Sequence, residues 1–293
     1  MLNESQIERL ITISKEKPLL PEKFVPWHEE IGINQFYMPE LLSSLNQTEL
    51  YNKLTEFQKI ELSRHEMAQV LYSYAWTEGL FCLFMNKIIL DLKPDSVEYR
   101  FLLRELIEEF RHQDMFATAI QKINGKPISP SKIHNFFGKI TAKYLPKSWV
   151  FISCLSIELI TDVYGKYTRK DPNTYIVMRK VGELHHIEEG RHIVFAENWL
   201  KKYTEQAGFI KRSWFSILVL INIYYLQSLY VKKEIFKRIG VENPDIFFKA
   251  AKSNFKINFA KHCTSTTKEF VERINGFNWL TKPLWRSVLK MEI

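Results

Sequence analysis

The sequence predicts an all-α fold: a four-helix bundle built from two antiparallel helical hairpins, with additional N- and C-terminal helices. Glycine is scarce, at 10 of 293 residues, and the 11 prolines are modest in number, which disfavours a turn-rich β fold. From about residue 57 the chain runs in long segments that contain almost no glycine. Proline-containing breaks divide these segments into helices near 57–92, 96–123, 147–170 and 174–203.

Two short breaks, at 92–96 and 170–174, join these helices in pairs. Each break contains a proline and ends in Ser96 or Thr174, and either side chain can cap the helix that follows. Short connections of this kind make antiparallel hairpins. The link between the hairpins, 124–146, is long enough to cross from one end of a bundle to the other.

The chain is long enough to form one domain over 1–293, with the bundle core at 57–205. A hydrophobic share of 46% allows a sizeable core. Residues 1–56 contain several prolines and predict short helices and loops. Helical pattern continues beyond 204, with breaks near Gly240, Pro244 and Pro283, and carries no functional prediction.

Composition narrows the compartment and the partners. Cys82, Cys154 and Cys263 form no CxxC pair, as expected for unpaired thiols in a reducing, cytoplasmic compartment. The N-terminus lacks a signal-peptide pattern. The most apolar stretch, 214–230, contains four polar residues, so we expect a buried helix and no membrane anchor.

Basic residues are spread along the chain, although the net charge is +8. This distribution predicts a solvated basic surface and no nucleic-acid stripe. Docking of an acidic partner such as a carrier protein stays open.

Two segments, 108–112 and 188–192, both read E-E-x-R-H and lie 80 residues apart. A lone glutamate precedes the second glutamate of each motif by 31 residues, at Glu78 and at Glu158. Both lone glutamates lie in apolar segments. Repetition of three positions at one offset is typical of a pseudo-symmetric site made from two similar hairpins.

The turn positions support this site independently. In an antiparallel hairpin, residues equidistant from the turn lie side by side. The midpoint of Glu78 and Glu109 falls at the first short break, and that of Glu158 and Glu189 falls at the second. Each pair is therefore expected at one depth, roughly 23 Å from its turn at 1.5 Å per residue.

Glutamate and histidine three residues apart share a helix face. Two such motifs and two lone glutamates in a bundle core are the arrangement of di-iron and di-manganese carboxylate proteins. Carboxylate and imidazole ligands suit iron, although manganese is not excluded. The six predicted ligands are Glu78, Glu109, His112, Glu158, Glu189 and His192. A single E-x-x-H, such as Glu183/His186, is usually an accident of a solvated face.

Residues beside the ligands suggest an outer layer of contacts. Glu108 and Glu188 are positioned to orient the histidines across the bundle, with Arg111 and Arg191 paired to them. Exposed Glu/Arg pairs are the alternative. Cys82 and Cys154 each lie one turn from a ligand and are interpreted as small core residues.

His185 breaks the repeat. It precedes Glu189 by four residues and His192 by seven, so all three share a helix face. The 80-residue offset places Glu105 at the matching position of the first hairpin. His185 is therefore either a polar core histidine or a third imidazole on one iron.

The motif His185-His-Ile-Glu188-Glu189-Gly-Arg191-His192, together with 108–112 and the lone glutamates, resembles the p-aminobenzoate N-oxygenase family of ferritin-like di-iron enzymes. The resemblance covers about 57–205. It implies seven ligands, which adds His185 to the six above. Glu188 departs from the pattern, since related di-iron proteins often carry aspartate there.

The resemblance also implies a function. Two iron ions would activate O₂, the co-substrate, through a peroxo-diferric intermediate. Oxygen would then pass to a small-molecule amine, free or bound to a carrier protein, through hydroxylamine towards nitroso and nitro products. An external donor would supply electrons, and a homodimer is allowed. Aromatic residues expected to line the pocket are Tyr74, Trp76, Phe81, Phe84, Phe151 and Phe195.

Alternatives remain open at this point. A di-iron hydroxylase or desaturase acting on an acyl chain would share six ligands without needing His185. A ribonucleotide-reductase-like radical protein would need Tyr72 or Tyr74 beside the iron. Iron storage and a metal-free interaction bundle are two further classes.

Overall fold

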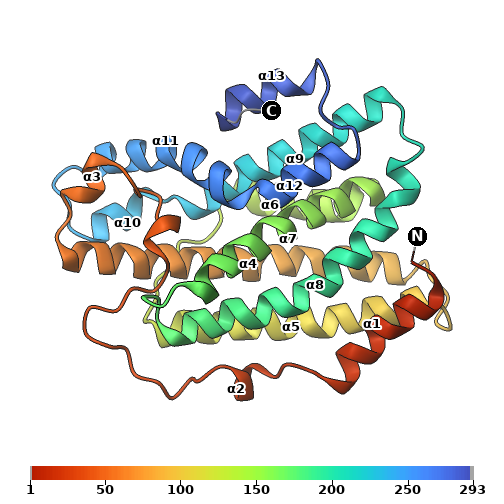
Figure 1. The fold of residues 1–293 in the computed structure, drawn as a ribbon, viewed down its shortest axis with the longest axis horizontal. Helices are drawn as coiled ribbons and strands as arrows, with labels where there is room; N and C mark the ends of the chain where they lie inside the picture. The colour runs from red at the N-terminus through yellow and green to blue at the C-terminus, as the bar shows by residue number, and fades with distance from the viewer. Residues whose placement is uncertain (1, 291–293) are drawn as a thin grey trace.

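The computed structural model, which describes residues 2–290, contains the predicted four-helix bundle (Figure 1). Its helices are α4 (Glu56–Ile89), α5 (Val97–Lys122), α7 (Lys147–Lys170) and α8 (Ile176–Thr204). Their ends lie within three residues of the predicted ones. No β-strand occurs among the described residues, where the β pairing consists of one isolated bridge between Phe36 and Thr174. The predicted all-α, ferritin-like fold class is confirmed.

The hairpins form as the breaks predict. α4 packs on α5 and α7 packs on α8, while α5 faces α8 across the bundle. Ser96 caps α5 by accepting a hydrogen bond from the backbone N–H of Tyr99. The expected Thr174 cap is wrong: its hydroxyl donates to Asp171, and the backbone N–H of Tyr175 donates to the Phe36 carbonyl at 2.8 Å. The start of α8 is therefore fixed by the N-terminal segment.

A close approach between two glycines sets the spacing of α7 and α8. A Cβ on Gly165 would lie 3.1 Å from the carbonyl oxygen of Gly182. The two glycines share the 173–174 midpoint of Glu158 and Glu189, so they report the same hairpin register. The absence of side chains here allows the two helix backbones to lie together.

The link at 124–146 contains a helix that the sequence did not predict, α6 (Lys132–Tyr144). The expected crossing is confirmed. Near its start, Arg64 of α4 donates to the Asn124 carbonyl, and at its end Lys147 pairs with Asp91, just beyond α4. α6 follows α4 between these points, with Trp76 donating to Asn135.

The flanking helices cover two sides of the bundle. α1 (Glu4–Glu16) packs on α5, and α2 (Pro21–Phe24) packs on α8. On the opposite side, seen at the top of Figure 1, C-terminal helices pack on α7 and α4. The remaining elements are η1 (Glu40–Leu42), α3 (Glu49–Asn52), α9 (Phe209–Tyr230), α10 (Lys233–Arg238), α11 (Pro244–Cys263), α12 (Ser265–Arg273) and α13 (Thr281–Leu289). The breaks expected near Gly240, Pro244 and Pro283 are confirmed, because 239–243 and 274–280 separate helices. Pro283 itself lies in the first turn of α13, where proline is tolerated.

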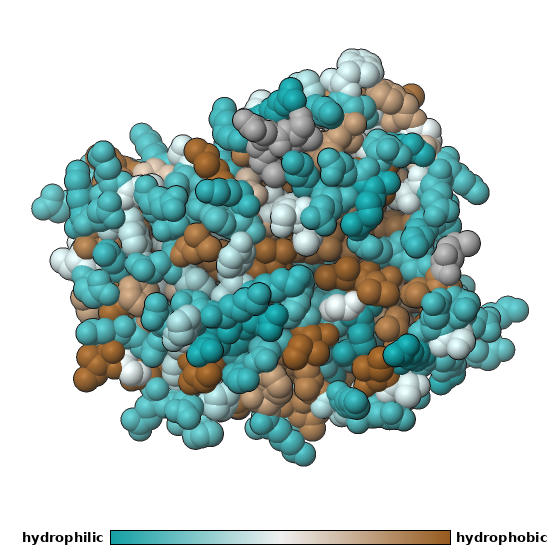
Figure 2. All heavy atoms as spheres, in the orientation of Figure 1, coloured by the Kyte–Doolittle hydropathy of each residue, from teal (hydrophilic) through white to brown (hydrophobic). Residues whose placement is uncertain are grey.

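Two stretches are long and apolar enough to cross a membrane, Lys147–Lys170 and Phe209–Arg238. Their most apolar windows are 89% and 61% buried, and core helices of soluble proteins meet the same criteria. The surface in Figure 2 is mainly hydrophilic, with a band of apolar side chains across its middle. The absence of a membrane anchor stays a prediction.

Candidate metal centre

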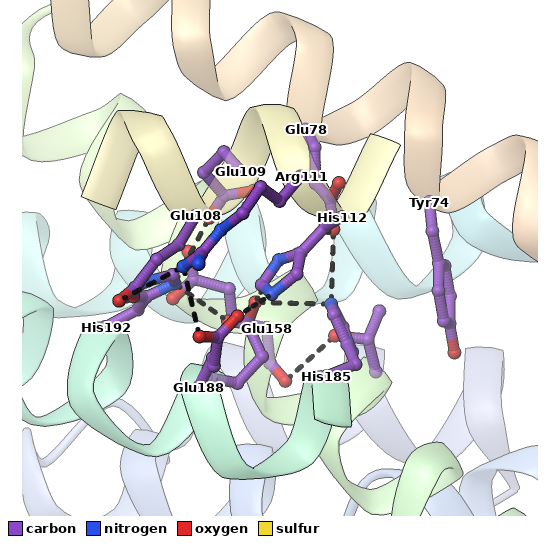
Figure 3. A network of polar contacts seen from close by, with 12 residues as sticks. Tyr74, Glu78, Glu108, Glu109, Arg111, His112, Glu158, His185, Glu188 and His192 are labelled. Carbon is purple, nitrogen blue, oxygen red and sulfur yellow. Dashed lines mark hydrogen bonds and ion pairs between the residues drawn. The ribbon is translucent and has the colours of Figure 1, made fainter. Parts of the chain in front are cut away.

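All four bundle helices direct carboxylates or imidazoles into one buried region (Figure 3). α4 and α7 each contribute one lone glutamate, Glu78 and Glu158. α5 and α8 contribute the E-x-x-H pairs and, from α8, His185. None of the seven predicted residues is more than 5% exposed: Glu78, Glu109, His112, Glu158, His185, Glu189 and His192.

The first group of possible ligand atoms is centred on His185. Its Nε2 lies 3.1 Å from Glu78 Oε1 and 3.2 Å from Glu189 Oε1. His112 Nδ1 lies 3.8 Å and 3.6 Å from the same two oxygens. The four residues offer ligand atoms within 4.8 Å of one another. This is a compact set of two carboxylates and two imidazoles.

Two further groups adjoin the first. One contains Glu105, Glu109 and His192, and the other contains Glu109, Glu158 and Glu189. His192 Nδ1 lies 3.2 Å from Glu109 Oε1. Glu109 and Glu189 each belong to two groups, which is the position that a carboxylate bridging two metal ions requires.

The outer carboxylates hold the two histidines from opposite helices. His112 Nε2 of α5 lies 2.9 Å from Glu188 Oε2 of α8. His192 Nε2 of α8 lies 2.9 Å from Glu108 Oε2 of α5. An N–H at Nε2 leaves the Nδ1 lone pair directed at the cluster, which is the orientation that a metal ligand needs.

Arginines complete this outer layer across the bundle. Arg111 donates to Glu188 at 3.2 Å, and Arg191 donates to Glu108 at 2.8 Å. The alternative of exposed Glu/Arg pairs is wrong for the carboxylates, because Glu108 and Glu188 are buried. Ser14 of α1 also donates to Glu108 at 2.5 Å, a contact that no sequence motif indicated.

The unpaired atoms of the cluster fit a pair of cations. Buried atoms without a hydrogen bond include one oxygen each of Glu78, Glu105, Glu158 and Glu189, both oxygens of Glu109, and Nδ1 of His112 and His192. Buried polar atoms are normally paired, so such a concentration needs an explanation. With each Nε2 donating outward, Nδ1 and the nearby carboxylate oxygens are all acceptors. Only a cation or a proton between them makes the contacts favourable.

The pKa values of the cluster residues reflect the same concentration of buried carboxylates. Burial and, to a smaller extent, the neighbouring Glu109 carboxylate raise the pKa of Glu78 to about 8. Burial also raises the pKa of Glu158 well above its usual range. Burial lowers the pKa of His185, but its contacts with Glu189 and Glu78 outweigh this effect and raise it to about 10. Without a metal ion the cluster therefore retains protons, and metal binding must release them.

Glu105 is the residue that the motif search did not assign to the site. It is 4% exposed, and its Oε2 has no hydrogen-bond partner. The 80-residue repeat relates the first group, Glu78–His112–His185–Glu189, to Glu158–His192–Glu105–Glu109. Three of these four counterparts form the second observed group. The repeat thus makes Glu105 the counterpart of His185, although one residue is a glutamate and the other a histidine.

Other predicted residues lie apart from the cluster. In the unmatched Glu183/His186 motif, Glu183 pairs with Lys180 and His186 contacts Asp162. Cys82 and Cys154 are buried and belong to none of the three groups.

The two candidate radical tyrosines differ in position. The Tyr74 ring stacks on the His185 imidazole, with centroids 5.6 Å apart (Figure 3). Tyr72 instead donates to Ser129, away from the cluster.

The aromatic residues expected to line a pocket divide into two sets. Trp76 and Phe81 line a cavity of about 520 Å³ beside the cluster. Tyr74 lines a second, much smaller cavity among the cluster residues. The expectation is wrong for the other three residues, Phe84, Phe151 and Phe195, which line neither cavity. Phe84 packs on Phe151, and Phe195 stacks on Phe101.

Residues 3–275 match the model of one protein family, described as p-aminobenzoate N-oxygenase AurF. The chain belongs to this family. The match extends the resemblance from the bundle to nearly the whole chain. The family is one of di-iron oxygenases, and the buried glutamate and histidine groups could bind metal.

Relatives of the chain occur in mycobacteria. The uncharacterized protein Mb0909 of Mycobacterium bovis (strain ATCC BAA-935 / AF2122/97) is 27% identical over 170 residues. The uncharacterized protein Rv0885 of Mycobacterium tuberculosis (strain ATCC 25618 / H37Rv) has the same identity over the same length. Each match covers 57% of this chain and 50% of the relative, so the chain spans about half the length of these relatives.

Proposed function

We propose that this chain is a non-haem di-iron oxygenase that N-oxygenates an arylamine, first to the hydroxylamine and then towards nitroso and nitro products. The observation that carries the proposal is the group of buried, unpaired ligand atoms from four helices. Two of its imidazoles are oriented by carboxylates of the opposite hairpin. Family membership supports the reaction class.

We assign the side chains to two iron positions from the groups they form. Glu78, His112 and His185 would hold one iron, and Glu158 and His192 the other. Glu109 and Glu189 would bridge, because each belongs to two groups. Glu105 would be an eighth ligand, on the iron that Glu158 and His192 hold. One iron would then carry an extra neutral imidazole and the other an extra carboxylate, so their charges would differ.

The reaction needs an external reductant. Two bound Fe(II) ions would supply the electrons that start the reduction of O₂. Conversion of an amine to a hydroxylamine consumes one O₂, two protons and two electrons, which the external reductant restores to the iron ions, and releases one water. One oxygen atom enters an N–H bond, and the other leaves as water.

The chain's own part is orientation and exclusion of water. Glu108 and Glu188 accept the Nε2 protons of the two motif histidines, which fixes one tautomer of each ring. Phe116 and Tyr74 pack edge-on and face-on against His185. The apolar packing keeps bulk water from the site, which strengthens electrostatic interactions within it.

Reconstitution tests the proposal. The protein is loaded anaerobically with Fe(II), exposed to ¹⁸O₂ with a reductant, and supplied with a panel of arylamines. Mass spectrometry should detect hydroxylamine, nitroso or nitro products that carry ¹⁸O. Iron-loaded protein that consumes O₂ yet oxidises no amine would instead support the acyl hydroxylase or desaturase alternative.

One observation favours a second candidate, the radical protein, because Tyr74 stacks on His185. Its phenol oxygen is buried without a hydrogen-bond partner. A tyrosyl EPR signal that appears after O₂ exposure and disappears in Tyr74→Phe would establish this function. Absence of the signal would remove it.

The remaining assignments are also proposals. We infer a cytoplasmic enzyme that acts without nucleic acid or a membrane and takes a free or carrier-bound amine. A homodimer is compatible with these assignments, and sedimentation at several concentrations would identify the oligomeric state.

A further inference from the structure

A cavity of about 520 Å³ lies between α4, α6, α7 and α9. This volume is within the range of small-molecule sites, roughly 300–1,000 Å³. Its walls are mainly aromatic and aliphatic and include Trp76, Phe81, Phe137, Ile157 and Tyr225. We call this cavity the side chamber.

The side chamber adjoins the candidate metal centre through a thin partition. Thr77, Phe81 and Ile157 line both the chamber and the small cavity that contains Glu78, Glu109, Glu158, His185 and Glu189. Thr77 and Ile157 directly precede the lone glutamates Glu78 and Glu158 in sequence. A molecule in the chamber is therefore separated from the ligands by single side chains.

No lysine, arginine, aspartate or glutamate is among the described residues that line the side chamber. Its histidine, His134, contacts the hydroxyls of Ser131 and Ser228 with its two ring nitrogens, at 2.6 Å and 2.8 Å. Burial and nearby Lys232 lower the pKa of His134 below its ordinary value, which favours the neutral ring. Lys232 donates to the Ser228 carbonyl at 2.7 Å and is not among the residues that line the chamber. The walls of the chamber therefore provide no charged side chain to pair with a carboxylate.

The missing counter-charge discriminates between amines. An ionised carboxylate that enters an apolar cavity without a partner loses several kcal/mol of hydration free energy. A protonated alkylamine meets the same penalty. An arylamine is neutral at pH 7, because its nitrogen lone pair is delocalised into the ring, and its ring can stack on Trp76 or Phe81.

We propose that the side chamber binds an uncharged aromatic amine and discriminates against arylamines that carry a carboxylate, such as the p-aminobenzoate of the family's name. The inference rests on the proposed function, since the amine must reach the metal centre. Thr141, Ser153 and Asn222 of the chamber provide hydroxyl and amide groups that can bond to neutral polar substituents.

A matched pair of ligands tests the proposal by binding alone. 4-Methylaniline and 4-aminobenzoate share the ring and the amino group and differ in methyl against carboxylate. Calorimetric titration of the iron-loaded protein should give at least tenfold tighter binding of 4-methylaniline. Equal or tighter binding of 4-aminobenzoate would overturn the proposal.

Variants test whether this chamber is the binding site. Thr141→Arg adds a cation to its partly exposed wall, and Thr141→Gln is the neutral control. Relative to the control, the arginine should shift the preference towards 4-aminobenzoate by tenfold or more. An unchanged preference both in Thr141→Arg of α6 and in Asn222→Lys of α9 would place the binding site elsewhere. Iron stoichiometry equal to that of the unmodified protein verifies that each variant is folded.

The outcome separates this inference from the proposed function. An enzyme that loads two irons and oxidises 4-aminobenzoate in preference to 4-methylaniline would refute the chamber's selectivity and leave the oxygenase intact. Tight binding of 4-methylaniline without any oxidation would support the chamber's selectivity and refute the proposed oxygenase.

Discussion

Each histidine of the repeated motif receives its orientation from the opposite hairpin. Glu188 of α8 holds His112 of α5, and Glu108 of α5 holds His192 of α8. Contacts with His192 and Arg191 outweigh the effect of burial and lower the pKa of Glu108 to about 2. The outer carboxylates therefore link correct helix pairing to correct ligand geometry.

Replacing one outer carboxylate should weaken iron binding while leaving the ligands in place. Glu108→Gln removes the charge that faces His192 and Arg191, and such outer contacts are worth about 10–100-fold in metal affinity. An anaerobic Fe(II) titration measures the change. The control is Glu8→Gln, which makes the same substitution in an exposed pair with Arg100 and should leave the affinity unaltered. Equal affinities of the two variants would contradict the orienting role.

Glu105 should affect one of two iron positions. In Glu105→Gln we expect one binding step to weaken by at least tenfold, with the other step preserved. Mössbauer spectra of ⁵⁷Fe-loaded protein should then show one altered doublet. His185→Gln should alter the other doublet. Spectra of Glu105→Gln that match the unmodified protein would remove Glu105 from the ligand set.

Glu66 predicts a pH-dependent stability away from the metal centre. Burial raises its pKa from 4.5 to about 7, although Ser44 donates a hydrogen bond to it. The folded state therefore binds more protons than the unfolded state between about pH 4.5 and pH 7, and stability falls as the pH rises through this window. Glu66→Gln should remove this fall, which amounts to at most about 3 kcal/mol at 1.4 kcal/mol per unit. Urea unfolding at pH 5 and pH 8 measures it, and an equal fall in both proteins would contradict the assignment.

Of the eight proposed ligands, the repeat and the turn midpoints predicted six, and the family resemblance added His185. The structure places these seven residues in one buried cluster. The sequence predicted less about Ser14, whose contact with Glu108 depends on how α1 packs against α5. Glu105 was identified only as the counterpart of His185. Because the two residue types differ, the motif did not assign Glu105 to the site; its burial and its group with Glu109 and His192 do.

At the scale of single elements, helix α6 was not predicted, whereas the four bundle helices were. α6 was missed because its link begins with strong loop signals and its apolar residues Ile133, Phe136 and Phe137 are more than half exposed. The bundle helices were predicted because proline-containing breaks divide long segments that contain almost no glycine.

The approach of α7 to α8 should be sensitive to a side chain at Gly165. Gly165→Val places methyl groups against the Gly182 carbonyl, where even a Cβ would lie at 3.1 Å. We expect a loss of about 1–3 kcal/mol in the free energy of unfolding, typical of overpacking. Gly190→Ala is the control, since a Cβ there meets nothing within 4 Å, and it should stabilise by about 0.5–1 kcal/mol. Thermal unfolding of the iron-free proteins compares them, and equal melting temperatures would argue against the close approach.

At the scale of the whole molecule, the bundle supplies the ligands and the later helices supply the space beside them. No function was predicted for the region beyond 204, yet α9 contributes Asn222 and Tyr225 to the side chamber. Such contacts depend on how separate helices pack, and no local motif records them. Family membership over residues 3–275 also includes this region.

Anaerobic titration with Fe(II), followed by Mössbauer spectroscopy, tests the central claim most directly. The account predicts two irons per chain in two distinct environments, because one position has His185 and the other has Glu105. Binding of fewer than about one iron per chain would contradict it, since a carboxylate bundle site of this kind is built for two.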